Sequence, residues 1–396
     1  MFDRERVERF FLITLIALAI IFCFYKLSYP DLQKWDETTN ANVVYESLHS
    51  NRPWILQFEK KPFFEKTPLW YYATMGIVKI LGFNKYTLRL VSAFSGFLLI
   101  LLIYMLGKML YTRFAGLMAG FTLLATGHLF FFHPGGYFSS HHIRSADSDI
   151  LQILLIVFSF YAFCRVTKGN TSWIYSGVIA SALAVMSKGP MGILPLIVFF
   201  ICGILSKKRL CLSFSQIALA VSFFIILVMP WHIYMYLQFK EKFINSYFYY
   251  HLLRRVISPL EKHGEPWWFY FKLLSIRQVF FSLELLVAAF VARVINRQTK
   301  RLVYTRFGLL VTIVLILLII TIVKTKLAWY ILPLYPFAAL VIGGFLNQLR
   351  EKGFLYLILV ISSMVLFYSV GRNLTAIIQT PKGNIYNVPK ISSFDN

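Results

Sequence analysis

Long apolar runs, separated by short polar segments, constrain this sequence more than any other feature. A helix of about 17 to 25 apolar residues crosses the hydrocarbon core of a bilayer. Runs near this length can be placed at residues 10–27, 90–107, 114–133, 150–166, 172–187, 189–206, 213–236, 276–296, 305–323, 329–347 and 354–371. Of the 396 residues, 58% are hydrophobic and only 14% are charged, whereas soluble chains are ~25% charged. The sequence therefore predicts an all-α polytopic membrane protein with eleven spanning helices.

The formal net charge of +23 could suggest a nucleic-acid partner. Much of the Lys and Arg lies in short loops between apolar runs, however, where such residues set orientation and contact anionic lipid. We therefore expect membrane lipids as partners and no nucleic acid. The four cysteines lie within or at the ends of apolar runs and show neither paired nor metal-ligand spacing, so we expect no chemistry from them.

The short apolar segment 69–82 decides the topology. If it does not cross the membrane, the positive-inside rule places the main clusters of cations together in the cytoplasm; if it does cross, all of them face outward. These clusters are Lys108 with Arg113, Arg165 with Lys168, residues 207–209, residues 293–306, and Arg350 with Lys352. We therefore expect an interfacial helix at 69–82, a cytoplasmic N-terminus and an external C-terminal tail.

The external segments in this topology are residues 28–89, 134–149, 188–190, 237–275 and 324–328. Residues 28–89 alone hold six of the 17 acidic residues, namely Asp31, Asp36, Glu37, Glu46, Glu59 and Glu65. Solvated loop charge would explain any one of them. Their gathering on the less basic side of the membrane favours an active site on that side.

Two pairs of external carboxylates are candidates for chemistry. Asp36 and Glu37 follow the first apolar run, and Asp147 and Asp149 stand immediately before another. Each pair could simply place acids at a helix N-terminus, where they cap the helix or oppose its dipole. Asp147 and Asp149, preceded by Arg144 and two histidines, could instead hold a hard cation or a sugar hydroxyl.

Five external segments also contribute cations. Each cation could be an ordinary interfacial residue whose charged end reaches water. Together they could hold a phosphate group at the membrane surface, because Arg and Lys are the residues that bind phosphate. The candidates are Lys66, Arg144, Lys188, Arg254 and Lys326.

The order and spacing of these motifs resemble the bacterial lipid-linked-sugar glycosyltransferases of the GT-C superfamily, in the branch of protein mannosyltransferases and lipid A aminoarabinose transferases. The resemblance extends from the first apolar run to about residue 342. Its landmarks are Asp36 with Glu37, residues 64–69, 89–93, 144–149 and 187–190, His251 with Arg254, and residues 263–266, 324–327 and 330–333. No single landmark is specific, but together they are.

The resemblance implies inverting transfer of a sugar from undecaprenyl phosphate to an envelope lipid, glycan or protein on the periplasmic face of the bacterial inner membrane. It implies a catalytic acid at Asp36, a second acidic position at Asp149, and substrate contacts from Glu37 and Asp147. It also implies a phosphate-binding Lys66. Glu65 and His251 match the positions of metal ligands, so a divalent cation such as Zn, Mg or Mn is expected if the transfer is metal-assisted rather than metal-free. Residues 1–371 would form the GT-C-type unit, with the first periplasmic catalytic loop at 28–89, and residues 372–396 a short periplasmic tail.

Two departures and two competing functions remain. Family members often carry Arg three residues after the first Asp, where this chain has Thr39, and aminoarabinose transferases have a sizeable periplasmic domain where this chain has its short tail. A transporter or flippase should bury polar groups at the bilayer midplane, where Glu284 is the one unassigned acid. An envelope glycan polymerase or ligase would use the same lipid carriers.

Overall fold

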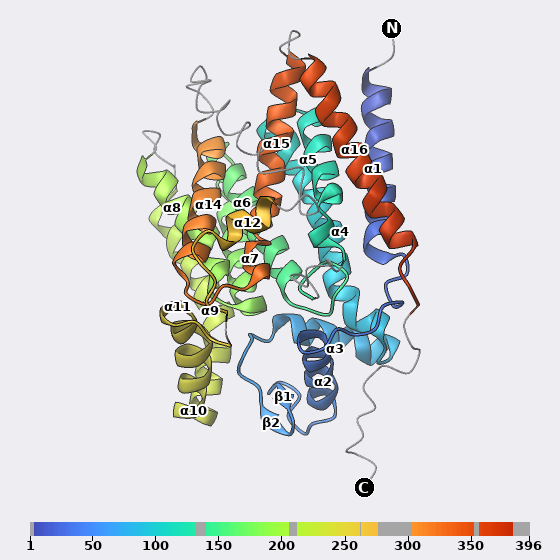
Figure 1. Ribbon diagram of the computed structural model, residues 1–396. Helices are drawn as coiled ribbons and strands as arrows, with labels where there is room; N and C mark the ends of the chain where they lie inside the picture. Colours follow the sequence, from blue (N-terminus) through green and yellow to red (C-terminus); the bar gives the residue numbers. More distant parts are fainter. Residues whose placement is uncertain are drawn as a thin grey trace.

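The computed structural model describes residues 4–131, 140–205, 212–261, 263–275, 303–351 and 356–382. It is all-helical apart from one short hairpin (Figure 1). The predicted span at 276–296, Glu284 and residues 383–396 of the predicted tail lie outside the described residues.

The described elements follow one another in this order: α1 (Arg4–Phe24), α2 (Asp36–Leu48), β1 (Gln57–Phe58), β2 (Lys61–Pro62), α3 (Leu69–Leu81), α4 (Lys85–Leu110), α5 (Arg113–Ala125), η1 (Gly127–Leu129), α6 (Asp149–Thr167), α7 (Trp173–Lys188), η2 (Pro190–Ile193), α8 (Leu194–Leu205), α9 (Phe214–Phe239), α10 (Glu241–Phe243), the π-helix η3 (Ile244–Arg254), α11 (Arg255–Ile257), α12 (Phe269–Ser275), α14 (Val303–Ile322), η4 (Ala328–Ile331), α15 (Leu334–Glu351) and α16 (Tyr356–Ile378).

The helices confirm a multi-span membrane fold. Within the described ranges, six helical stretches are long and apolar enough to cross a membrane: Glu5–Phe24, Lys85–Leu110, Asp149–Thr167, Phe214–Phe239, Ala328–Glu351 and Leu359–Ile378. Shorter apolar helices at Arg113–Ala125, Trp173–Lys188, Pro190–Leu205 and Arg306–Ile322 coincide with further predicted runs. The last helix continues to Ile378, seven residues beyond the predicted end of the final run.

Helix α3 coincides with the segment expected not to cross. Its 13 residues span only about 20 Å at 1.5 Å per residue, but α5 is equally short, so the position of α3 and not its length distinguishes it. Figure 1 shows α3 with α2 and the hairpin, at the end of the bundle opposite the N-terminus. Trp70, Tyr71 and Val78 of α3 pack in the same apolar cluster as Val43 and Val44 of α2. The position of α3 supports its assignment as an interfacial helix.

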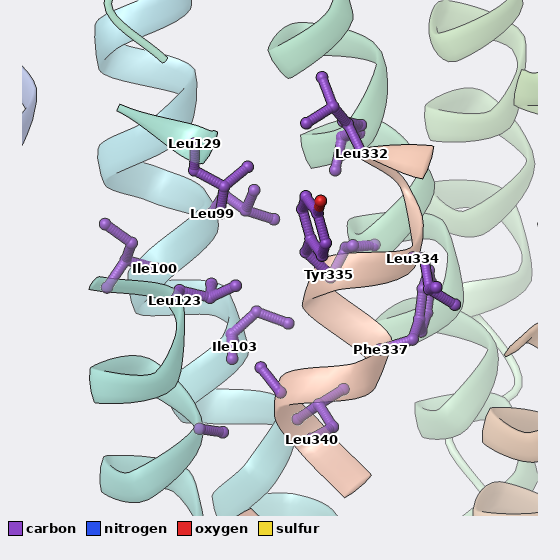
Figure 2. Packing of buried hydrophobic residues seen from close by; sticks show 14 of the residues in the cluster. Leu99, Ile100, Ile103, Leu123, Leu129, Leu332, Leu334, Tyr335, Phe337 and Leu340 are labelled. Atoms are coloured by element: carbon purple, nitrogen blue, oxygen red, sulfur yellow. The ribbon is translucent and has the colours of Figure 1, made fainter. Parts of the chain in front are cut away.

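The core of the bundle forms where α4, α5 and α15 meet (Figure 2). Leu99 and Ile103 of α4 point toward Tyr335 and Leu340 of α15, and all four are buried. Helices α5 and α15 approach closely at Gly343, where an added Cβ would lie 2.3 Å from the carbonyl oxygen of Ala115. Small residues allow such close contact between membrane helices, so this glycine fixes the position of α15.

Cations from several of the clusters predicted to be cytoplasmic gather around the turn between α4 and α5. The Arg306 Nε donates to the carbonyl oxygen of Leu110, and Lys168 Nζ donates to that of Met109. The Arg350 guanidinium lies over the ring of Phe114, and Arg113 pairs with Glu5 and Glu8 of α1. This shared location, remote from α2, supports the topology that charge predicts.

Candidate active site

The first external segment places Asp36 at the start of α2. Trp35 precedes it in the left-handed region, at φ 72°, where a residue other than glycine is strained. Glu46 on the same helix accepts hydrogen bonds from the backbone N–H groups of Glu59 and Lys60 at the hairpin tip. The segment is therefore an ordered structure and holds Asp36 in place.

The second external segment brings Asp147 to the same place. Ser92 of α4 donates to the carbonyl oxygen of Asp147 at 2.6 Å, and Asn40 of α2 donates to that of Ala146 at 2.8 Å. His141 has φ 65°, and such strained positions are common at functional sites. Side chains of α2 and α4 thus determine where Asp147 lies.

Four of these residues, Asp36, His141, Asp147 and Asp149, form what we call the acid–histidine cluster. Nε2 of His141 is 3.1 Å from Oδ2 of Asp36, while Nδ1 is 3.1 Å from Oδ2 of Asp147 and 2.6 Å from Oδ2 of Asp149. The imidazole ring therefore lies between Asp36, from the first segment, and the two acids from the second. The sequence indicated these acids but not that His141 would join them.

Two lysines flank the acid–histidine cluster. Nζ of Lys66 is 3.5 Å from Asp36 and 3.4 Å from Asp147. Lys188, at the end of α7, donates to Asp149 and is 3.9 Å from Asp147. With His141 protonated, three cations face three carboxylates. The arrangement can therefore bury its charges without a large net charge, which an unpaired buried ion could not do.

These pairings change the proton affinities of the cluster. Burial alone would raise the pKa of Asp36 and of Asp147, but His141 and Lys66 hold both pKa values well below the ordinary range. Burial would likewise lower the pKa of His141, but the three carboxylates together raise it to about 10 despite opposition from Lys188. Asp36 and Asp147 are therefore ionised and His141 is a cation at neutral pH.

Trp329 of η4 covers one face of His141. The two rings are stacked, with centroids 3.9 Å apart and planes at 15°. A cationic imidazole on an indole face gains cation–π attraction. The sequence does not indicate this role for Trp329, because neither residue type nor spacing predicts its contact with His141 across 188 positions.

The Glu65–His251 pair is arranged differently. Glu65, in the loop before α3, is exposed, and His251 in the π-helix η3 is half-buried. Burial, Arg255 and Lys66 lower the pKa of His251 to about 4, so its imidazole is neutral. Although the Glu65 side chain reaches solvent, the protein around its carboxyl removes part of the hydration and so raises its pKa, against the effects of Lys66 and Arg255. Lys66 and Arg255 thus affect the pKa of both residues, but no contact between Glu65 and His251 is found within the described ranges.

Three predicted substrate contacts are occupied by the protein itself. Glu37 is 1% exposed and forms an ion pair with Arg89. Arg144 donates to the carbonyl oxygens of Phe22 and Lys26 at the end of α1. The Lys326 Nζ lies within hydrogen-bonding distance of three carbonyl oxygens, those of Ile320, Thr321 and Val323. An ammonium group has three donors, so these contacts favour a helix-capping role for Lys326.

Arg254, by contrast, is exposed, with its guanidinium over the ring of Tyr250. Its neighbour Arg255 is half-buried and 3.6 Å from Glu261. Arg255 also influences both Glu65 and His251, as described above. Of the two arginines in the predicted phosphate region, Arg255 therefore has the closer relation to the Glu65–His251 pair.

Donor atoms of the acid–histidine cluster fit a divalent cation. Ligand atoms of Asp36, His141 and Asp147 all lie within 4.8 Å of one another, and within the described ranges the buried Nε2 of His141 has no aligned hydrogen-bond partner. Lys66 and a protonated His141 would compete with a metal there. The neutral His251 and the exposed Glu65 also carry donor atoms of a kind that binds divalent cations, and their joint binding of one ion stays a prediction.

Comparison with known proteins identifies relatives of this chain. Residues 65–234 match the dolichyl-phosphate-mannose-protein mannosyltransferase family. An uncharacterized protein of Aquifex aeolicus is 26% identical to this chain, and the match covers 90% of this chain and 69% of that protein. The undecaprenyl phosphate-alpha-4-amino-4-deoxy-L-arabinose arabinosyl transferase of Pseudomonas savastanoi is 28% identical over 85% of this chain. The match spans 61% of that transferase, so this chain corresponds to only part of its length.

Solved structures show the same fold. The crystal structure of ArnT from Cupriavidus metallidurans bound to undecaprenyl phosphate matches with a TM-score of 0.72 at 19% identity, covering 89% of this chain and 63% of ArnT. The oligosaccharyltransferase of Archaeoglobus fulgidus in complex with Zn and sulfate matches with a TM-score of 0.55 at 12% identity, covering 94% of this chain and 54% of that one. The resemblance predicted from the sequence motifs is confirmed.

Proposed function

We propose that this chain, a GT-C-type glycosyltransferase related to the protein mannosyltransferases and aminoarabinose transferases, transfers a sugar from a polyprenyl phosphate to an envelope acceptor. The observation that carries the proposal is the acid–histidine cluster with Lys66 beside it. A polyprenyl-phosphate sugar already has a fair leaving group. The enzyme must therefore take a proton from the acceptor hydroxyl and stabilise the phosphate that departs.

Asp36 is the proposed general base. Its carboxylate is held ionised by Lys66 and His141, so it can accept a hydrogen bond from an acceptor hydroxyl at any pH near neutrality. A carboxylate with a lowered pKa is a weak base, but the hydroxyl becomes acidic as its oxygen bonds to the sugar carbon. Proton transfer to Asp36 therefore belongs late in the step, when the bond between sugar and phosphate is largely broken.

Inversion follows from a single displacement. The acceptor oxygen attacks the anomeric carbon from the side opposite the phosphate, one carbon–oxygen bond forms as the other breaks, and the electron pair leaves with the phosphate. Asp149, the second acidic position of the predicted site, is paired with His141 and Lys188, and we propose that it is a positioning residue that keeps the imidazole oriented toward Asp36. Asp147 orients Lys66 and His141 in the same way.

The proposed phosphate contacts are Lys66, Lys188 and Arg254, with Arg255 added on its position beside Glu65 and His251. Lys66 is well suited because the acids around it, chiefly Asp147, outweigh the effect of burial and hold its pKa well above the ordinary value. A divalent cation held by Glu65 and His251 would supply further positive charge for the departing phosphate. Arg144, Lys326 and Glu37 are omitted from this set because their polar atoms bond helix-end carbonyl oxygens or Arg89 rather than groups of the acid–histidine cluster.

We place this activity within residues 1–371, on the periplasmic face of the bacterial inner membrane, with an envelope lipid, glycan or protein as acceptor. Cysteine labelling in intact cells tests the orientation. A cysteine at Lys61 in the exposed hairpin should react with an impermeant reagent, and one at Lys168 should not. Reaction at Lys168 from outside would contradict the orientation.

Transfer itself is tested with purified protein, a radiolabelled polyprenyl-phosphate sugar and a panel of acceptors. The proposal predicts label in an acceptor, loss of label from the donor, and inverted anomeric configuration in the product. Movement of intact donor across a vesicle membrane without transfer would instead identify a flippase. Growth of the donor into longer glycans would identify a polymerase.

A further inference from the structure

A buried ion pair joins Glu37 of α2 to Arg89 of α4. Glu37 directly follows Asp36 of the acid–histidine cluster in the chain. Nε of Arg89 is 2.9 Å from Oε1 of Glu37, and Nη2 is 2.9 Å from Oε2. Both residues are 1% exposed. Two parallel hydrogen bonds of this kind fix the relative orientation of the two side chains as well as their distance.

The remaining donors of Arg89 bind the chain that connects α1 to α2. Nη1 donates to the carbonyl oxygens of Leu27 and Pro30, and Nη2 donates to that of Asp31, all at 2.9 Å. One guanidinium therefore holds the end of the first helical segment, the connection and the start of α2 against α4. This connection leads directly to Asp36.

The Glu37 carboxylate holds the other external segment. Oε1 accepts a hydrogen bond from the N–H of Ala146 at 2.6 Å, and Oε2 accepts one from the N–H of Gln33 at 2.8 Å. Ala146 is adjacent to Asp147, and Glu37 is adjacent to Asp36. Glu37 thus follows Asp36 directly in the chain, and its carboxylate contacts the neighbour of Asp147, an acid 111 positions away from Asp36.

We propose that Glu37 and Arg89 form a positioning pair that sets the separation of Asp36 and Asp147, and with it the contacts of His141 and Lys66. The inference rests on the proposed function. Neither residue of the pair reaches solvent or the cluster's own polar atoms, so neither is a catalytic residue. Their effect on transfer would come through geometry, and a misplacement of about 1 Å can cost roughly 10²-fold in rate.

Glu37→Asp tests this pair most sharply. It keeps the charge that balances Arg89 but shortens the side chain by one methylene, so it cannot hold the Arg89 fork and the Ala146 N–H together. We expect kcat to fall about 100-fold, with the KM for the donor within about threefold and the purified yield unchanged. Arg89→Lys, which keeps charge but removes the fork, should behave in the same way.

Asp31→Asn is the matched control. It removes the 3.2 Å pair with Lys85 in the same connection but leaves the Asp31 carbonyl that Arg89 contacts. Its kcat should stay within about twofold of the wild type, because neither Glu37 nor Ala146 depends on that carboxylate. A loss equal to that of Glu37→Asp would show a general sensitivity of the connection and would overturn the assignment.

Hydrogen exchange separates this inference from the proposed function. In Glu37→Asp, peptides covering residues 33–40 and 141–149 should exchange faster together, while those of α15 remain unchanged. If the wild type transfers no sugar, the proposed function fails but this pattern still tests the pair. Unchanged exchange in both peptides, wild-type kcat in a folded variant, or failure of both variants to fold would overturn the positioning role.

Discussion

The acid–histidine cluster and the Glu65–His251 pair both combine carboxylates with a histidine, but the contacts around them differ. The cluster is held by contacts of 2.6 to 3.5 Å that join buried groups to the partly exposed Asp36, and Ser92, Asn40 and Glu37 fix the backbone around it. Glu65 is exposed on a loop, His251 lies on a π-helix, and no contact joins them in the part of the chain that the structure describes. Buried polar contacts preorganise the cluster, whereas no such contact fixes Glu65 relative to His251 in the described residues. We therefore expect the chemistry to depend most strongly on the cluster.

Asp36→Asn should have the largest effect. The amide keeps the size of the side chain but cannot take a proton, so kcat should fall about 10²- to 10⁴-fold, while folding and donor binding are retained. Steady-state transfer with purified protein measures the loss. Glu59→Gln, an exposed acid of the same external segment outside the cluster, is the control. Activity within a few-fold of the wild type would make Asp36 a helix-terminal acid and Asp149 the next candidate for the base.

Lys66→Met should have the next largest effect. Lys66 is the cation that contacts both Asp36 and Asp147. A hydrogen bond to a charged group is worth about 1.5–3 kcal/mol, so kcat/KM should fall about 10- to 100-fold. Lys61→Met in the exposed hairpin is the matched control and should change little. A loss below about threefold would remove Lys66 from the phosphate site.

The Glu65–His251 pair should show a smaller effect. Loss of one charged contact predicts about a tenfold fall in kcat/KM for Glu65→Ala or His251→Ala. If the pair holds a metal, a chelator should reduce the wild type to the same level, zinc should restore it, and His251→Ala should be insensitive to the chelator. Full activity in both variants and in chelated enzyme would exclude a required metal. Strong chelator sensitivity in His251→Ala would instead favour a metal at Asp36, His141 and Asp147.

Arg144→Met and Lys326→Met should have the smallest effect on transfer. Both cations bind carbonyl oxygens at the ends of helices, where such contacts are worth about 0.3–1 kcal/mol and up to about 2 kcal/mol when partly buried. We expect a lower thermal midpoint with kcat and donor KM within about threefold. A large rise in donor KM at unchanged stability would restore the phosphate-binding role that the sequence suggested.

Much of the fold and part of the site could be predicted from the sequence. The apolar runs predicted the long helices, because spanning length and the lack of charge leave few other structures in a membrane. Asp36, Lys66, Asp147, Asp149 and Lys188 were also indicated, because topology placed their segments on one side of the membrane. The structure brings these five side chains together.

The remaining contacts depend on partners that spacing does not reveal. Arg144 and Lys326 have the charge that phosphate needs, but carbonyl oxygens at helix ends need it equally, and only packing decides between them. Similarly, the sequence does not reveal whether the Glu37 carboxylate is solvated or buried. It is buried because Arg89, on another helix, supplies its ion-pair partner. His141 could not be assigned because its role depends on acids from two segments and on the stacked ring of Trp329.

Single-turnover transfer at saturating donor tests the central claim most directly, because it reports chemistry without product release. Asp36→Asn and His251→Ala would be compared with the wild type in the same preparation. The claim that the buried cluster carries the chemistry predicts that Asp36→Asn is at least about tenfold slower than His251→Ala, in line with the loss of a general base. A His251→Ala rate equal to or below that of Asp36→Asn would contradict it.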